Sequence, residues 1–323
     1  MSDSVELSLV IPCYNDAGYL AESTSRIIRA LDEQGIRFEM IFVDDYSADD
    51  TRALIEELVA ADSRCRAVYH EVNRGRGSSF RSGAMIARGQ IVGFADIDLE
   101  VHERFIADMV QAVRRGADVA TGWRRIKLSL RPYDLVRHAM SIGYASLYRQ
   151  LLRLPTRDPE TGFKFFRKAA LQELLQHATA SGWFFDSEVM AYSTLLGLRL
   201  EEVPCEFIRR ADKRSSVRLV RSTIQQTREL VTFALALRRE RNARRARRAI
   251  TPRSSADPAR SSSVSAMPEH RYRLPAGRLV EVIRGPIVSR EIAEGLRIKP
   301  RLEPSATGVG QPRRDLFDRR ERV

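Results

Sequence analysis

The sequence predicts an α/β fold in which a mostly parallel sheet is covered by helices on both faces. Within residues 1–122, short apolar segments alternate with longer segments whose apolar residues recur at helical spacing. Parallel strands need a crossover connection, usually a helix, so this regular alternation favours a parallel sheet. Hydrophobic residues make up 43% of the 323-residue chain, which is enough for a buried core.

The predicted elements follow one another along the chain. Short buried strands are predicted at residues 7–12, 38–44, 66–70, 91–96, 118–122, 163–166 and 199–204. Helices are predicted at residues 20–34, 49–61, 78–88, 103–114, 133–154, 168–177, 187–196 and 217–237. Gly35 permits the turn that ends the first helix, and Asp49 and Asp50 offer N-cap oxygens to the second. In such sheets ligands bind where the strands end, so the residues that follow the strands are candidates for a site.

The net charge of +12 is distributed unevenly. Residues 1–212 carry 27 basic and 31 acidic side chains, a net charge of −4. Residues 213–250 carry 12 and 2, a net charge of +10, and residues 251–323 carry 15 and 9, a net charge of +6. The arginine-rich segment lacks the interleaved aromatic residues that stack on bases, and the body is acidic. We therefore expect no nucleic-acid partner.

The C-terminal segments predict contact with a membrane surface but no membrane span. The longest apolar run of the C-terminal half, residues 230–237, is far shorter than the roughly 20 residues that cross a bilayer. Residues 213–250 form a basic amphipathic segment that suits an anionic membrane surface, and a helix packed on the core is the alternative. Residues 251–323, which begin with a Ser/Pro/Ala/Arg-rich stretch, are predicted to be a largely disordered tail.

The cysteines and the N-terminus predict a cytoplasmic protein. Cys13, Cys65 and Cys205 have no paired spacing, which argues against a zinc site or a disulfide framework and fits a reducing compartment. The acidic N-terminus lacks the basic region of a signal peptide.

Two aspartates end the predicted strand at residues 91–96. Asp96 and Asp98 lie two residues apart, so their side chains point to the same side. Two like charges at one place need a compensating cation, and Mg²⁺ or Mn²⁺ commonly binds one or two carboxylates together with substrate phosphates. A helix cap or a solvated loop is the alternative for the isolated pair.

Other polar residues follow the first three strands. They are Pro12, Tyr14, Asp16, Asp44 and Asp45, which offer aromatic and acidic groups for a base and ribose hydroxyls. The loop Asn73-Arg74-Gly75-Arg76-Gly77 opens the helix that carries Arg81. Glycine permits close approach of a ligand, and a helix N-terminus attracts phosphate. Taken singly, each group is also typical of an ordinary turn.

In their order along the chain, these groups resemble the family 2 glycosyltransferases, which have the Rossmann-like GT-A fold. The matching segments are Ile11-Pro12-x-Tyr14-Asn15, Val43-Asp44-Asp45-x-Ser47-x-Asp49-x-Thr51, Asn73-x-Gly75-x-Gly77 and Asp96-x-Asp98. Later segments resemble the branch that uses dolichol and polyprenyl phosphates, namely Gly122-Trp123-Arg124, Arg157-Asp158-x-x-x-Gly162-Phe163-Lys164 and Phe185-Asp186-x-Glu188. The resemblance covers residues 5–235 and implies a GT-A domain at residues 1–212.

The resemblance implies roles for individual residues. A GDP- or UDP-sugar donor would be bound by Pro12, Tyr14, Asp16, Asp44, Asp45, Asn73, Arg76 and Arg81. Mg²⁺ or Mn²⁺ would be held by Asp96, Asp98 and Glu100, with Asp98 as the principal ligand. The acceptor side would be formed by Arg124, Arg137, Ser141 and Lys164, with Asp158, Asp186 and Glu188 beside them. The catalytic residues would be Asp96, Asp98, Arg124 and Arg137.

Four positions depart from the family's usual residues. Tyr46 replaces a glycine, Asp16 a glutamate, Glu100 a glutamine and Thr161 a cysteine. Tyr46 lies in the second matching segment, so its replacement of glycine bears on how the base or ribose is held and hence on donor identity. Metal coordination tolerates all four changes.

The implied reaction is metal-dependent, inverting transfer of a hexose from a nucleotide sugar to dolichyl or undecaprenyl phosphate at the inner face of the plasma membrane. A phosphate acceptor is already ionised at neutral pH, so it needs cations rather than a general base. The alternative is a family 2 glycosyltransferase with a hydroxyl acceptor in cell-envelope polysaccharide or glycolipid synthesis, for which Asp158 and Asp186 are candidate bases. The intact Asp96/Asp98 pair argues against a non-catalytic scaffold.

Overall fold

The computed structural model describes residues 4–126, 132–154, 156–208 and 219–250. Its centre is a seven-stranded sheet with strand order β3-β2-β1-β4-β6-β5-β7. The strands are β1 Leu7–Cys13, β2 Phe38–Asp44, β3 Cys65–Tyr69, β4 Ile91–Phe94, β5 Val119–Ile126, β6 Lys164–Arg167 and β7 Leu200–Phe207. The central strands are apolar without alternation, and every residue of β2 is buried, as expected where both faces of a sheet are covered.

The sheet is mostly parallel, which confirms the predicted fold class. β1 pairs in parallel with β2 and β4, β2 with β3, and β5 with β7. β6 runs antiparallel between β4 and β5, with Lys164 opposite both Phe94 and Thr121. The first residue of β6 therefore lies at the edge where β4 ends, beside the loop that carries Asp96.

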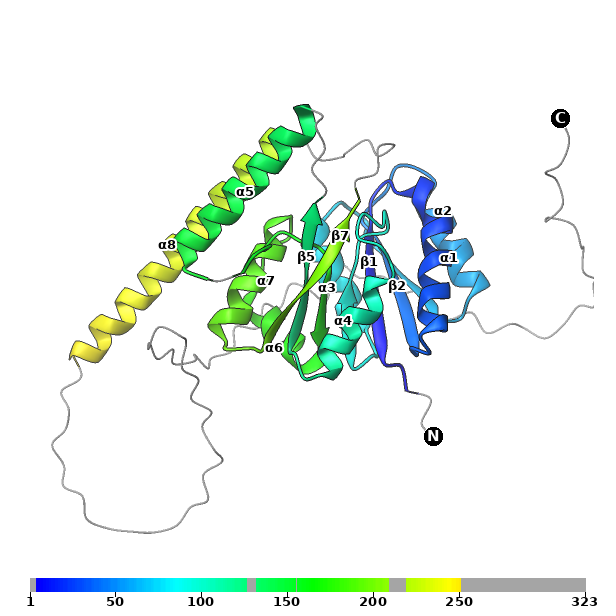
Figure 1. Cartoon of the computed structure of the whole chain (residues 1–323), viewed down its shortest axis with the longest axis horizontal. Helices are drawn as coiled ribbons and strands as arrows, with labels where there is room; N and C mark the ends of the chain where they lie inside the picture. Colours follow the sequence, from blue (N-terminus) through cyan, green and yellow to red (C-terminus); the bar gives the residue numbers. More distant parts are fainter. Residues whose placement is uncertain (1–3, 127–131, 155, 209–218, 251–323) are drawn as a thin grey trace, which may run out of the picture.

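Helices cover both faces of the sheet (Figure 1). One hydrophobic cluster joins the sheet to α1 Ala17–Glu33, α2 Thr51–Ala61 and α4 Phe105–Arg114. The other joins it to α3 Arg76–Ile86, α6 Lys168–His177 and α7 Phe184–Leu195. Phe80 of α3 is fully buried and stacks on Phe94 of β4, with ring centroids 4.4 Å apart. This contact fixes the start of α3 against the end of β4.

Two long helices, α5 Pro132–Leu152 and α8 Leu219–Ile250, lie side by side next to the sheet (Figure 1). Tyr144 and Tyr148 of α5 pack with Leu230 and Ala234 of α8 in a third cluster, which also includes residues of α7. The apolar residues of α8, predicted to share one face, are divided by this packing. Leu230 is buried, whereas the exposed side of α8 includes Ile224, Val231 and Leu235.

The segment boundaries predicted at residues 212 and 250 remain predictions, because residues 213–218 and 251–323 lie outside the described residues. Within the part of the chain that is described, α8 packs on the core, so its residues 230–237 are joined to the α/β body. No helix in that part is both long and apolar enough to cross a membrane.

Candidate active site

A cavity of about 250 Å³ opens at the carboxyl ends of β1, β2 and β4. Its walls come from the loops after these strands, from the start of α3, and from residues near the starts of α7 and α8. The residues that line it are Pro12, Cys13, Tyr14, Asp16, Asp45, Asn73, Gly75, Arg76, Ser79, Asp96, Ile97, Asp98, Trp183 and Ser222. Most of the predicted donor- and metal-binding residues are among them.

The loops after β1 and β2 are joined by hydrogen bonds. The side-chain oxygen of Asn15 accepts a hydrogen bond from the backbone N–H of Ala48 (2.8 Å), and the Ser47 hydroxyl accepts one from the N–H of Asn15 (3.0 Å). Asn15 has a φ of 55°, in the left-handed region that asparagine tolerates better than most residues. This junction keeps Tyr14 on the cavity wall with 42% of its surface exposed, so its ring can stack on a base.

The two acidic residues of these loops have different positions. Asp16 lines the cavity, and its Oδ2 accepts a hydrogen bond from the N–H of Tyr14 (2.9 Å). Asp44 is 1% exposed, does not line the cavity, and accepts a hydrogen bond from the N–H of Ser47 (3.2 Å). A direct contact between Asp44 and a ribose would therefore require its loop to move.

Asp96 and Asp98 both line the cavity after β4. Asp98 is 4% exposed and accepts a hydrogen bond from the N–H of Glu100 (3.1 Å), whereas the Asp96 side chain is 46% exposed. Among the described residues, no three His, Cys, Asp or Glu side chains are grouped so that they could hold a metal ion. Two carboxylates fit Mg²⁺ or Mn²⁺ if diphosphate oxygens and water complete the coordination. Glu100, the third predicted ligand, does not line the cavity.

Arg76, the first residue of α3, connects the Asp96/Asp98 pair to α7. Its Nη2 donates a hydrogen bond to Asp96 Oδ1 (2.6 Å), and its Nη1 donates one to Asp186. The guanidinium carbon lies 4.2 Å from the ring centroid of Phe94 and 5.2 Å from that of Trp183, which are cation–π distances. Burial would lower the pKa of Arg76, but Asp96 and Asp186 outweigh it and raise that pKa. The cavity wall therefore carries a fixed positive charge beside the two carboxylates that are predicted to bind a metal ion.

Lys164 and Asp186 form a buried ion pair next to Arg76. The Nζ of Lys164 donates hydrogen bonds to Asp186 Oδ1 (3.0 Å) and to the carbonyl of Thr161. Burial lowers the pKa of Lys164, and Asp186 opposes that shift. Because Arg76 binds Oδ2, each carboxylate oxygen of Asp186 faces a cation.

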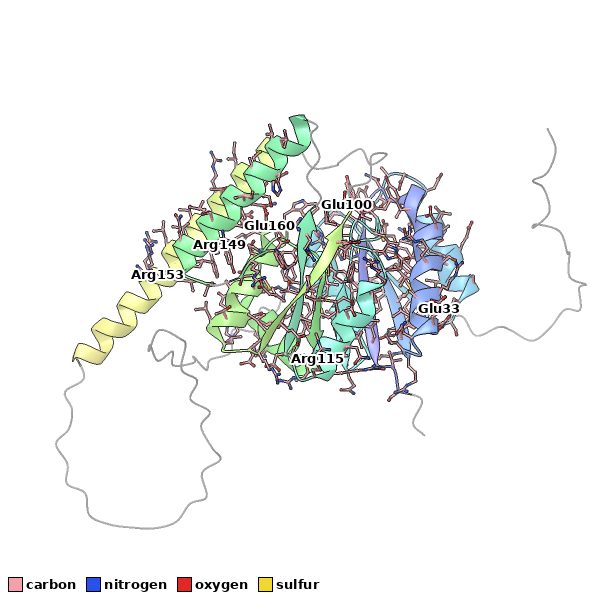
Figure 2. The ribbon with its side chains drawn as sticks, viewed as in Figure 1. Glu33, Glu100, Arg115, Arg149, Arg153 and Glu160 are labelled. Atoms are coloured by element: carbon pink, nitrogen blue, oxygen red, sulfur yellow. The ribbon has the colours of Figure 1, made fainter. Side chains whose placement is uncertain are left out.

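Arg124 of β5 binds Asp158 through two parallel hydrogen bonds, Nε to Oδ2 (2.6 Å) and Nη2 to Oδ1 (2.7 Å). Burial would raise the pKa of Asp158, but Arg124 outweighs it and lowers that pKa. The Oε2 atom of Glu160 lies 3.9 Å from Arg124 Nη2 and accepts a hydrogen bond from the Ser141 hydroxyl (2.9 Å). Burial raises the pKa of Glu160. Figure 2 shows Glu160 and Glu100 near the same end of the sheet and Arg115 near the opposite end.

The structure places three of the four predicted acceptor residues beside the cavity rather than in its wall. Arg124, Ser141 and Lys164 belong to the charged network just described and are not among the residues that line the cavity. Arg137 belongs to α5, but the position of its side chain lies outside what the structure describes.

Arg81, predicted to bind the donor, points away from the cavity. Its guanidinium donates hydrogen bonds to the carbonyls of Leu175 (2.8 Å) and Ala178, near the end of α6. Burial lowers the pKa of Arg81. Glu188, predicted to brace the acceptor side, accepts a hydrogen bond from the N–H of Ala180 (2.7 Å) before α7. Both side chains hold parts of the fold together, and Arg81 is not among the residues that line the cavity.

Asp45 lines the cavity, but its carboxylate is used within the protein. It lies 2.7 Å from His70 Nδ1 and accepts hydrogen bonds from the N–H groups of Arg74 and Gly75, both at 2.8 Å. Burial would raise the pKa of Asp45, but these hydrogen bonds outweigh it and lower that pKa. Sequence reasoning assigned Asp45 to the donor and missed His70. His70 directly follows the third strand, at the same sheet edge as Asp45 and Asp96, and this position could have identified it as a candidate site residue.

Trp183 and Ser222 were also missed, because they reach the cavity from the starts of helices far along the chain. Neither belongs to a segment that resembles a donor-binding motif.

Residues 8–175 match the family model described as glycosyl transferase family 2. The chain belongs to this family. It is therefore a glycosyltransferase, and the cavity at the strand ends is its candidate active site.

The relatives of this family 2 glycosyltransferase include enzymes named for dolichyl phosphate. Glycosyltransferase AglD of Haloferax volcanii is 31% identical over 225 residues, which cover 68% of this chain and 35% of AglD. The dolichyl-phosphate beta-glucosyltransferase of Saccharomyces cerevisiae is 25% identical over 254 residues, 72% of this chain and 75% of that enzyme. The dolichol-phosphate mannosyltransferase of Pyrococcus furiosus is 30% identical over 173 residues, 52% and 48% of the two chains. The match thus spans only 35% of AglD, about a third of its length.

Solved structures share the fold. The glucosyl-3-phosphoglycerate synthase of Mycobacterium tuberculosis, in complex with Mn²⁺, UDP and phosphoglyceric acid, has a TM-score of 0.55 at 22% identity and covers 71% of this chain and 78% of its own. The mannosyl-3-phosphoglycerate synthase of Rubrobacter xylanophilus has a TM-score of 0.55 at 17% identity, with 88% of each chain covered. These likenesses confirm the predicted GT-A fold.

Proposed function

We propose that this glycosyltransferase moves a hexose from a GDP- or UDP-sugar to a polyprenyl phosphate, with inversion at the anomeric carbon. The donor would occupy the cavity, with its base against Tyr14 and its diphosphate near Asp96, Asp98 and Arg76. Bound Mg²⁺ or Mn²⁺ would neutralise charge on the leaving diphosphate. Arg76 adds a positive charge on the same wall, where negative charge develops as the sugar–oxygen bond breaks.

The observation that favours a phosphate acceptor is the state of the candidate bases. A hydroxyl acceptor needs a carboxylate that can take its proton, and Asp158 and Asp186 are the candidates. Asp186 is bound by Arg76 and Lys164, and Asp158 is bound by the Nε and Nη2 atoms of Arg124. The oxygens of both carboxylates are thus already bound by cations of the protein, and Arg124 lowers the pKa of Asp158, whereas an ionised phosphate needs no base.

The same ion pairs supply cations beside the cavity. Lys164 and Arg124 would exchange part of their contact with carboxylates for contact with the acceptor phosphate, and Ser141 would donate a hydrogen bond to it. The names of the yeast and Pyrococcus relatives support an acceptor of this class.

The alternative is a hydroxyl acceptor in cell-envelope polysaccharide or glycolipid synthesis, and one observation favours it. Glu160 is the carboxylate beside Arg124 whose pKa is raised by burial, which makes it a better proton acceptor than Asp158. In that reaction Glu160 would be the general base.

We place the reaction at the cytoplasmic face of the plasma membrane, because the proposed acceptor is a lipid. The basic segment at residues 213–250 supports contact with anionic headgroups. The acidic body supports the absence of a nucleic-acid partner.

Donor turnover with matched acceptors tests the proposal. The purified protein is incubated with Mn²⁺ and UDP- or GDP-sugars, with either a polyprenyl phosphate or the corresponding polyprenol. We expect release of nucleoside diphosphate and a lipid-linked sugar phosphate only with the polyprenyl phosphate. Equal or faster glycosylation of the polyprenol would favour the hydroxyl-acceptor alternative.

Two variants serve as controls. Asp98→Ala removes a metal ligand and should reduce turnover to background, whereas Asp108→Ala alters an exposed acid on α4 and should leave it unchanged. Equal background rates in the wild type and Asp98→Ala would contradict an active metal site.

A further inference from the structure

His70 is a buried histidine whose two ring nitrogens both have partners. Nδ1 lies 2.7 Å from Asp45 Oδ1, and Nε2 lies 2.9 Å from the Ser82 hydroxyl. The His70 side chain is 0% exposed and that of Asp45 is 6% exposed. Because an ionised carboxylate only accepts hydrogen bonds, Nδ1–H donates to Asp45, while Nε2 and the Ser82 hydroxyl form the second hydrogen bond.

The order serine–histidine–aspartate is also that of hydrolytic enzymes, but it cannot act as a nucleophilic site here. Ser82 is 8% exposed, and neither Ser82 nor His70 lines the cavity. A substrate in the cavity does not reach the Ser82 hydroxyl, so the role of Ser82, His70 and Asp45 must be to hold neighbouring segments in place.

What Asp45 holds is the arginine–glycine loop. Its carboxylate accepts hydrogen bonds from the N–H groups of Arg74 and Gly75, and its carbonyl accepts one from the side chain of Asn73 (3.2 Å). Gly75 has a φ of +87°, and a Cβ atom there would lie 2.8 Å from the carbonyl oxygen of Ser181. The loop at residues 73–75 is thus closely packed at Gly75, and Asp45 forms hydrogen bonds with all three of its residues.

The loop ends at Arg76, which begins α3 and binds Asp96. A displacement of the loop would therefore move the Arg76 guanidinium relative to the metal-binding carboxylates. The orientation of the Asp45 carboxylate decides where the loop lies, and His70 fixes that orientation from the buried side.

We propose that His70 is a positioning residue for the donor site: through Asp45 it holds the loop at residues 73–75 so that Arg76 faces the donor diphosphate and Asp96. The proposal rests on the proposed function only in requiring that the cavity bind a nucleoside diphosphate. It is independent of the acceptor.

The test is the Kd of UDP and of GDP in the presence of Mn²⁺, measured by calorimetry on the full chain. His70→Gln places its amide near the position of Nε2 and loses the hydrogen bond to Asp45, so we expect Kd to rise about tenfold, the effect of one strong hydrogen bond. His70→Asn places its amide near Nδ1 and should stay within about threefold of the wild type. His177→Leu, on α6 and outside the cavity, is the matched control and should bind as the wild type does.

A double-mutant cycle separates positioning from a general loss of packing. If His70 acts through Arg76, His70→Gln should raise Kd in the wild type but not further in an Arg76→Ala background. Equal effects of His70→Gln in both backgrounds, or equal Kd values for His70→Gln and the wild type, would overturn the role of His70. Should His70→Gln not fold, Ser82→Ala carries the same cycle, with an expected rise of about twofold to threefold, and an unchanged Kd would be decisive against the proposal. Failure of the wild type to bind either nucleotide would instead overturn the donor site itself.

Discussion

Gly162 leaves the space in which the Arg76 guanidinium lies. A Cβ atom at position 162 would overlap the Nη2 atom of Arg76, which is the atom that donates to Asp96. The guanidinium, at the far end of a long side chain, would have to move aside and give up its contacts with Asp96 and Asp186. Gly162 thus belongs to the donor site although it does not line the cavity.

We expect Gly162→Ala to weaken binding of Mn²⁺ and nucleoside diphosphate by about tenfold, because one charge-assisted contact is displaced. The melting temperature should fall as well, because buried Asp186 would lose one of its two cations. Gly143→Ala is the control, since a Cβ atom there meets nothing within 4 Å and alanine favours the α5 helix by about 0.5–1 kcal/mol. Calorimetry and a thermal melt give both quantities, and unaltered affinity in Gly162→Ala would contradict the importance of the Arg76 position.

Glu160 should make stability depend on pH. Its pKa in the folded state is raised by burial, so the ionised form costs stability: the cost grows as the pH rises above the unfolded pKa and is fully present above the folded pKa. The cost is absent below the unfolded pKa of about 4.3, where the residue is protonated in both states. We therefore expect Glu160→Gln to raise the melting temperature at pH 7 and to have a smaller effect at pH 4. A larger gain at pH 4 than at pH 7 would have the wrong sign.

The sequence allows the acids of the site to be predicted better than its arginines. Asp96 and Asp98 follow a strand and must lie at the sheet edge, whatever the details of packing. Arg76 and Arg81 lie on one helix, five residues apart, which is about 140° around its axis. Only one of them can face the cavity, and the choice depends on how Phe80 packs against β4.

The helix α8 combines a buried side with an exposed side that carries both apolar and basic residues. Ile224, Val231 and Leu235 are 48%, 39% and 46% exposed. Arg228 and Arg238 are exposed on the same helix, so cationic and apolar groups both reach solvent. A helix surface of this composition binds anionic membranes through apolar insertion and charge attraction.

We expect the double variant Val231→Asp/Leu235→Asp to lose binding to vesicles that contain an anionic phospholipid. Two apolar groups are replaced by charges that the headgroups repel, so the bound fraction in a sedimentation assay should fall several-fold. Ala60→Asp/Ala61→Asp on α2 introduces the same charge at exposed positions and should bind like the wild type. Equal loss in both variants would indicate a net-charge effect instead of a docking face.

The positions of strands and helices could be predicted because they depend on local sequence patterns. The direction of a strand within the sheet could not be predicted in this way. The predicted helix at 168–177 is α6, and the predicted strand at 38–44 is β2, at the same residues. β6 was predicted as a strand, yet alternation of side chains is identical in parallel and antiparallel strands. Its reversal, which brings Lys164 to the active-site edge, depends on long-range pairing.

At the scale of the whole molecule, the described core continues past the boundary predicted at residue 212. Ser222 lines the cavity, and Leu230 and Ala234 are buried against α5 and α7. Every residue found in the cavity wall or in a hydrophobic cluster lies between residues 7 and 237. Residues 222–237 therefore belong to the described core at least as much as to a membrane-binding segment.

We expect a chain that ends at Ile250 to keep the melting temperature and the nucleotide affinity of the full chain. A chain that ends at residue 212 should lose several kcal/mol of stability, since it exposes the partners of Leu230 and Ala234, each worth about 1–3 kcal/mol when buried. Thermal melts and calorimetry on the three chains decide the boundary. Full stability in the shorter chain would restore the boundary at 212.

The position of β6 sets an order of assembly for the active site. In the sheet β6 separates β4 from β5, although it follows both in the chain. During synthesis on the ribosome, β1 to β4 can pair as soon as residues 7–94 have emerged, which places Asp96 and Asp98 at the end of a formed sheet. β5 then has no partner strand until residues 164–167 are available. We therefore expect the parallel half of the sheet, with Asp96 and Asp98 at its edge, to form before the late, non-local pairing of β6. The cavity itself would be completed only when Trp183 and Ser222 are available, so a nascent chain would hold the two aspartates in place before it could bind a nucleotide.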